Sequence, residues 1–106
     1  MTPEGRVKAK VDRALKKHFG VRCYPFKPVQ NGMGAPGLDY YCCIAGLFVA
    51  IETKVPGKGL TPRQSDTRSQ IIGAGGIVFV IHDENEIDAM VATMLLAMKA
   101  RGVHPR

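Results

Sequence analysis

The chain has 106 residues, enough for one domain with a small core, and its ordinary apolar and charged content excludes an intrinsically disordered protein. No apolar stretch approaches the roughly 20 residues of a membrane span, and the polar, basic N-terminus lacks a signal-type apolar region. Three cysteines without CxxC spacing argue against a disulfide framework and a structural zinc site. We therefore expect a single domain over residues 1–106, located in the cytoplasm (the host cytoplasm if virus-encoded).

The net charge of +6 is concentrated near the N-terminus, where residues 1–27 hold eight basic side chains and only two acidic ones. Clustered positive charge is expected of a protein that binds a phosphate backbone. It is equally expected of a helix face that is merely solvated, so charge alone leaves both explanations open.

The first helix is predicted to begin after Thr2, an N-capping residue followed by Pro3, and to end at Gly20. Apolar side chains recur between these ends at helical spacing. At 100° per residue Glu4 falls within this apolar stripe, so we expect it to face the core. Acids are also common in the first turn of any helix, which is the alternative explanation of Glu4.

Three strands are predicted next, over residues 21–26, 40–44 and 47–55. A glycine-rich segment between the first two spells GxGxxG from Gly32 to Gly37. In dinucleotide-binding proteins a helix begins within this pattern. Here Pro36 and the strand-like residues after it argue against a helix. We therefore expect no organic cofactor.

A second helix over residues 61–73, a strand over 77–81 and a helix with an apolar stripe from 87 to 98 complete the predicted order α-β-β-β-α-β-α. Thr61 and Gln64 form a capping box at the start of the second helix, which explains Gln64 without any catalysis. The methionines of the last helix are predicted to be core residues or a subunit contact.

The third predicted strand carries an unusual pair of charges. Glu52 and Lys54 share one face of this apolar strand, and burying such groups costs several kcal/mol unless they are partnered. Asp39 lies one strand upstream, and two acids with a base suggest a metal-dependent site that cleaves phosphodiesters. An inert ion pair for Glu52 and Lys54, and a turn role for Asp39, remain the alternatives.

As an ordered set, these residues resemble the PD-(D/E)xK nuclease superfamily, and more finely the small virus-type members of its VRR-NUC family. The resemblance extends from about Thr2 to Ile81. Its segments are Asn31–Gly34, Pro36–Asp39, Phe48–Lys54, Leu60–Gln64 and Ala74–Gly76 with the apolar strand that follows. It implies an α/β fold, with a restriction-endonuclease-like αβββαβ core, a mixed central sheet flanked by helices, and an additional C-terminal helix.

Leu38 departs from the family pattern, which usually has proline before the aspartate. That proline is a backbone feature and not a ligand, so we expect the chemistry to be intact. The resemblance implies a metal-dependent DNA endonuclease similar to structure-selective Holliday-junction resolvases. Asp39 and Glu52 would bind Mg²⁺ or Mn²⁺ with the backbone carbonyl of Thr53, and Glu4 would join them directly or through a water.

The same resemblance implies that Lys54 would position or activate the attacking water. It also implies that Gln64 would orient Lys54 or the scissile phosphate. Duplex or branched DNA would lie on a basic surface made of Arg6, Lys8, Lys10, Arg13, Lys16, Lys17, Lys58 and Arg63. Because the chain is short and compact members of the family are similar to dimeric resolvases, we expect a homodimer. The stripe of methionine and leucine on the last helix is one candidate for its surface.

Two functions of other classes stay open. A non-catalytic nucleic-acid-binding module that retains the nuclease fold would bind DNA in a salt-sensitive way without metal-dependent cleavage. A purely structural or interaction protein would neither bind nor cleave DNA.

Overall fold

The fold is built on one mixed sheet of four strands in the order β1-β2-β3-β4. In this computed structural model the described residues are 2–28 and 37–103. The strands are β1 (Cys23–Phe26), β2 (Tyr40–Ile44), β3 (Leu47–Thr53) and β4 (Ile77–Ile81). The first three strands are antiparallel neighbours, and β4 pairs with β3 in parallel. The predicted GxGxxG segment lies, except for its last glycine, outside the described residues.

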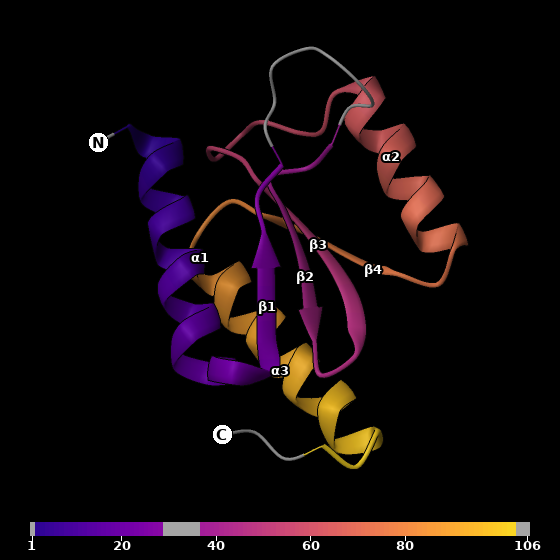
Figure 1. Cartoon of the computed structure of the whole chain (residues 1–106). Helices are drawn as coiled ribbons and strands as arrows, with labels where there is room; N and C mark the ends of the chain where they lie inside the picture. The colour runs from indigo at the N-terminus through magenta and orange to yellow at the C-terminus, as the bar shows by residue number, and fades with distance from the viewer. Residues whose placement is uncertain (1, 29–36, 104–106) are drawn as a thin grey trace.

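In the described residues three α-helices flank the sheet (Figure 1). The helices are α1 (Pro3–Phe19), α2 (Pro62–Gly73) and α3 (Glu84–Ala100), and a 3₁₀ turn, η1 (Gly20–Arg22), links α1 to β1. α1 and α3 pack against each other and one face of the sheet, whereas α2 lies beside β4. The predicted fold class and element order are confirmed.

Two predicted strand boundaries are wrong, each for a local reason. The strand predicted to begin at residue 21 begins at Cys23, because Gly20 has a φ of 51° and the chain completes a 3₁₀ turn before it pairs. β3 ends at Thr53 instead of residue 55, although the N–H of Lys54 still donates to the carbonyl of Ile81 at 2.9 Å.

The core lies between the sheet and the layer formed by α1 and α3. From the helices it receives Val11, Leu15 and Phe19, and the methionines of the predicted stripe, Met90, Met94 and Met98. Each of these methionines is at most 1% exposed, so the core interpretation is confirmed. These methionines are therefore not accessible to a second copy in this conformation, which removes them as a candidate dimer surface. None of the helices within residues 2–28 and 37–103 combines the length and the apolar character that crossing a membrane requires.

Candidate functional site

Two carboxylates meet where β2 begins and β3 ends. Tyr40 pairs with Ile51 across these antiparallel strands, so Asp39 and Glu52, the next residue on each strand, come together. The backbone N–H of Asp39 donates to Oε1 of Glu52 at 3.0 Å. Glu52 is 3% exposed and the side chain of Asp39 is 16% exposed, so both acids lie at the edge of the interior.

Thr53 holds the carboxylate of Asp39 in place. Its backbone N–H and its hydroxyl both donate to Oδ2 of Asp39, at 2.8 and 2.6 Å. The resemblance implied a role only for the backbone carbonyl of Thr53, and strand alternation places the Thr53 side chain on the face opposite Glu52. Asp39 lies just before the first residue of β2 and can accept these bonds across the strand edge.

We expect Thr53→Val to lower the free energy of unfolding by about 1.5–3 kcal/mol, because a buried hydrogen bond to a charged group is lost without change of side-chain shape. Urea denaturation measures this loss. Thr93→Val, at an exposed position of α3, is the matched control and should change stability by less than about 0.5 kcal/mol. Equal stabilities for both variants would contradict the assigned hydrogen bond.

Glu52 is surrounded by groups that act on its charge in opposite directions. Burial, and next the negative charge of Asp39, raise the pKa of the Glu52 carboxyl above its usual value. The hydrogen bond from Asp39 and the ammonium of Lys54, whose Nζ lies 3.6 Å from Oε2 of Glu52, act against this rise. The Lys54 side chain is itself only 17% exposed. The site therefore holds two carboxylates and an ammonium in a place where water screens charge poorly.

Gln64 connects α2 to this site and also caps the helix. Its Oε1 accepts from the N–H of Thr61 at 3.0 Å, while its Nε2 donates to Oε2 of Glu52 at 2.9 Å. The capping explanation of Gln64 is confirmed, and its side chain also contacts the site. The contact is with Glu52, whereas the resemblance implied that Gln64 orients Lys54 or the scissile phosphate.

Glu4 does not lie where the helical pattern predicted. Its side chain is 48% exposed, because the first turn of α1 extends beyond the core that covers Val11. Lys8 lies between the acids, 3.9 Å from Glu4 and 3.5 Å from Asp39. Among residues 2–28 and 37–103 no three acidic, histidine or cysteine side chains are grouped closely enough to hold a metal, so Glu4 does not join Asp39 and Glu52 directly.

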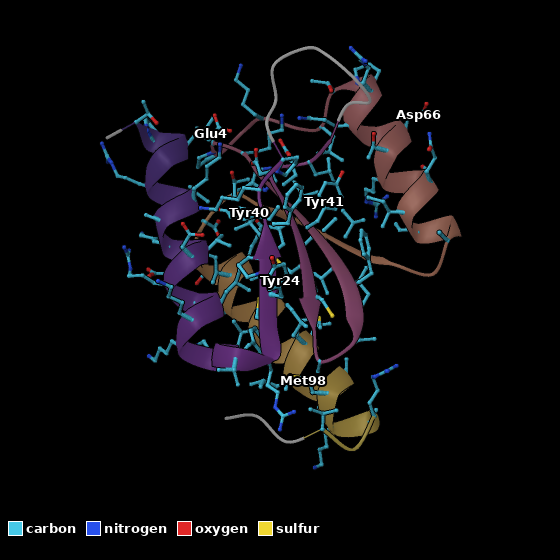
Figure 2. All side chains as sticks on the ribbon, viewed as in Figure 1. Glu4, Tyr24, Tyr40, Tyr41, Asp66 and Met98 are labelled. Carbon is cyan, nitrogen blue, oxygen red and sulfur yellow. The ribbon has the colours of Figure 1, made fainter. Side chains whose placement is uncertain are left out.

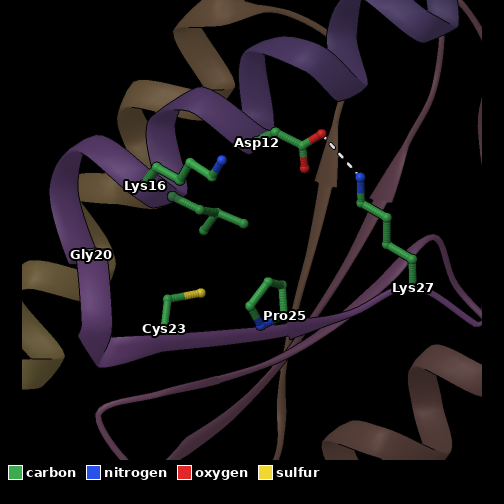
Figure 3. A pocket seen from close by; sticks show the side chains of 7 residues that line it. Asp12, Lys16, Gly20, Cys23, Pro25 and Lys27 are labelled. Carbon is green, nitrogen blue, oxygen red and sulfur yellow. Dashed lines mark hydrogen bonds and ion pairs between the residues drawn. The ribbon is translucent and has the colours of Figure 1, made fainter.

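The predicted DNA-binding residues are dispersed. Lys8 is a neighbour of Asp39, and Lys10 lies 3.9 Å from Glu84. Lys16 lines a cavity of about 390 Å³ between α1 and β1, shown in Figure 3, roughly 18 Å of helix away from Glu4. The side chains of Arg6, Arg13, Lys17, Lys58 and Arg63 are exposed.

Leu38, the departure from the family pattern, has a structural role of its own. It is fully buried, and its N–H donates to the hydroxyl of Tyr41 at 3.0 Å. A proline has no N–H to donate. The substitution is thus compatible with the local structure that positions Asp39.

His82 is a residue near the site that the sequence analysis missed. Its Nε2 lies 2.7 Å from the carbonyl oxygen of Lys58, and its Nδ1 lies 2.8 Å from Oε1 of Glu86. Both partners are acceptors, so the ring donates from both nitrogens only as the imidazolium. These contacts, the one with Lys58 first, raise the pKa of His82 above 6.5. The ring joins the loop after β3 to the start of α3.

We expect the stabilisation from His82 to depend on pH. A base with a raised pKa contributes stability that is complete below the ordinary value of 6.5 and is lost as the pH rises through the higher, folded value. His82→Ala should therefore lower the melting temperature more at about pH 6 than at about pH 8.5. Differential scanning calorimetry at both pH values tests this, and an equal loss at both would contradict it.

Comparison with known proteins supports the same fold. No family model and no curated protein sequence matches the chain. A solved structure described as a VRR_NUC domain is similar to it, with a TM-score of 0.73 and 19% sequence identity. The similarity covers 87% of this chain and 97% of that structure. At this identity the likeness establishes the fold.

Proposed function

We propose that this chain, which has the fold of a VRR_NUC domain, is a metal-dependent endonuclease that hydrolyses DNA phosphodiester bonds. The observation that carries the proposal is the pair of adjoining carboxylates, Asp39 and Glu52, with the largely buried ammonium of Lys54 beside them. Burial of such a cluster is costly, since three charged groups are withdrawn from water. Functional sites retain arrangements of this kind.

The donor set fits a hard divalent cation. Asp39 and Glu52 offer carboxylate oxygens, the ligands that Mg²⁺ and Mn²⁺ prefer. A cation would offset the burial and the repulsion from Asp39 that raise the pKa of Glu52. These two residues would hold the metal, with the carbonyl of Thr53 as the third protein ligand. When bound, the ion supplies positive charge for a phosphate oxygen and lowers the pKa of a water.

The other residues of the site act by position and charge. Lys54 holds an ammonium where it can orient the attacking water and stabilise negative charge that develops on the phosphate. Thr53 fixes Asp39 through two hydrogen bonds, and Gln64 fixes Glu52 through one. Each carboxylate is thus pre-oriented by a separate element, which lowers the cost of assembling the site.

A panel of substrates tests this proposal. Plasmid, linear duplex, flap and four-way-junction DNA are incubated with the protein in Mg²⁺, in Mn²⁺ and in EDTA. We expect cleavage of at least one substrate with either metal and none in EDTA. The preferred structure identifies the substrate class, and absence of cleavage throughout the panel would overturn the proposal.

The second candidate function is a non-catalytic nucleic-acid-binding module. The observation that favours it is that each acid already has a cation, Lys8 at 3.5 Å from Asp39 and Lys54 at 3.6 Å from Glu52. An inert network would have the same pairs. This function predicts salt-sensitive DNA binding with no cleavage in the same panel.

A homodimer is part of the proposal, with a surface other than the buried methionines of α3. Light scattering should then give about twice the chain mass of 11.5 kDa. A monomeric mass at working concentrations would contradict this part alone.

A further inference from the structure

One face of the sheet carries exposed aromatic side chains on β1 and at the start of β3. Tyr24, Phe26, Tyr41 and Phe48, which we call the aromatic face, alternate with the residues that point to the core formed by α1 and α3. Tyr24 is 75% exposed, Phe26 59% and Phe48 51%. The rings of Tyr41 and Phe48 lie 5.7 Å apart, and Figure 2 shows Tyr24 and Tyr41 on neighbouring strands.

The aromatic face lies on the same side of the sheet as Glu52. Phe48 and Glu52 are about 13 Å of strand apart on β3, with the fully buried Ala50 between them. On the exposed side, Phe26 pairs with Tyr41, which is two residues along the chain from Asp39. A ligand bound along the exposed rings would therefore end near the site.

Two hollows lie beside the aromatic face, and each is lined by an aromatic ring and a guanidinium group. One, of about 600 Å³, lies between β3 and α2 and is lined by Phe48 and Arg101. The other, of about 370 Å³, is lined by Tyr24 and Arg22. No acidic residue is among the described residues that line either hollow.

We propose that the aromatic face binds single-stranded DNA, with its rings stacked on unpaired bases and with Arg22 and Arg101 bound to phosphates. Proteins that bind single strands combine aromatic platforms with cationic grooves in this way. A contiguous exposed apolar patch marks an interaction site, and the cations at its border select a polyanion. If a second copy of this chain covered the aromatic face, Arg22 and Arg101 of both copies would lie at one interface without acidic partners.

The inference has a consequence for the substrate class, and this consequence rests on the proposed function. The DNA cut by this protein would carry an unpaired segment beside the scissile phosphate, as flaps, gaps and frayed branches do. Duplex DNA alone would leave the rings without partners, because its bases are stacked on one another.

Fluorescence anisotropy in EDTA tests the inference without any cleavage, so its failure is distinguishable from failure of the proposed function. The probes are labelled oligo(dT), an abasic oligonucleotide of equal length and the corresponding duplex. Tyr24→Ala and Phe48→Ala should each weaken oligo(dT) binding about tenfold and change binding of the abasic probe by less than about twofold. Phe26→Leu keeps apolar bulk and removes the ring, so it should also weaken oligo(dT) binding.

Leu96→Ala is the matched control, since Leu96 is 69% exposed on α3, away from the aromatic face. It should leave all three affinities unchanged. Equal losses on oligo(dT) and the abasic probe, or no loss on either, would overturn the inference. So would a Tyr24→Ala variant whose mass by light scattering halves while its oligo(dT) affinity is unchanged, which would assign the face to a second copy.

Discussion

Lys54→Ala is expected to lower the rate of DNA cleavage by about 10²- to 10³-fold, because in the proposed mechanism Lys54 is the positive group that acts on the reacting phosphate. The Lys54 ammonium is 3.6 Å from Glu52 and is mostly withdrawn from solvent, where its field is weakly screened. An inert ion-pair partner would affect stability and leave no mark on the chemical step. The expected signature is therefore a fall in the single-turnover rate at saturating enzyme.

Lys99→Ala is the control for Lys54→Ala, because Lys99 is an exposed lysine in the last turn of α3. It removes the same charge from the protein and should leave the rate within about twofold of wild type. A cleavage rate in Lys54→Ala equal to that of the control would remove Lys54 from the mechanism.

Asp39→Asn is expected to abolish cleavage and yet preserve or increase the stability of the metal-free protein. Asparagine keeps an oxygen that can accept both hydrogen bonds from Thr53. It also removes the charge that, after burial, raises the pKa of Glu52. A carboxyl whose pKa rises on folding opposes folding at neutral pH, so the variant loses a destabilising interaction.

Thermal melting with and without Mn²⁺ separates the two effects of Asp39→Asn. In EDTA the variant should melt at the wild-type temperature or above it. Added Mn²⁺ should raise the melting temperature of the wild type by mass action and leave that of the variant unchanged. Equal stabilisation of both proteins by Mn²⁺ would show that Asp39 is not a ligand.

The sequence predicts most of the fold because its boundary signals are local. Thr2 and Pro3 begin α1, and the capping box of Thr61 and Gln64 begins α2 as predicted. The meeting of Asp39 and Glu52 also follows from short-range features, since a tight turn at residues 45–46 fixes the register of β2 and β3.

Other parts of the site depend on contacts between distant elements. A helical wheel gives the direction of Glu4 and not the depth of the core beside it, so the exposure of this residue was not predictable. The choice of Glu52 over Lys54 as the partner of Gln64 depends on where α2 lies over the sheet. The hydrogen bond from the Thr53 hydroxyl to Asp39 forms because the chain at Asp39 passes the end of β3.

Strand alternation likewise assigns Tyr24 and Phe48 to one face of the sheet and leaves open whether a helix covers that face. Only the arrangement of α2 beside β4 shows that these rings remain exposed. Sequence patterns therefore predicted the carboxylates better than the surface that surrounds them.

Cleavage of the preferred DNA substrate as a function of Mn²⁺ concentration, for wild type and Asp39→Asn in parallel, tests whether Asp39 and Glu52 hold the catalytic metal. Both carboxylates are required ligands in the proposed site, beside the carbonyl of Thr53. Wild type should cleave with a saturable dependence on Mn²⁺ and stop in EDTA, and the variant should stay at background at every concentration. Wild-type cleavage that persists in EDTA, or equal cleavage by both proteins, would contradict the account.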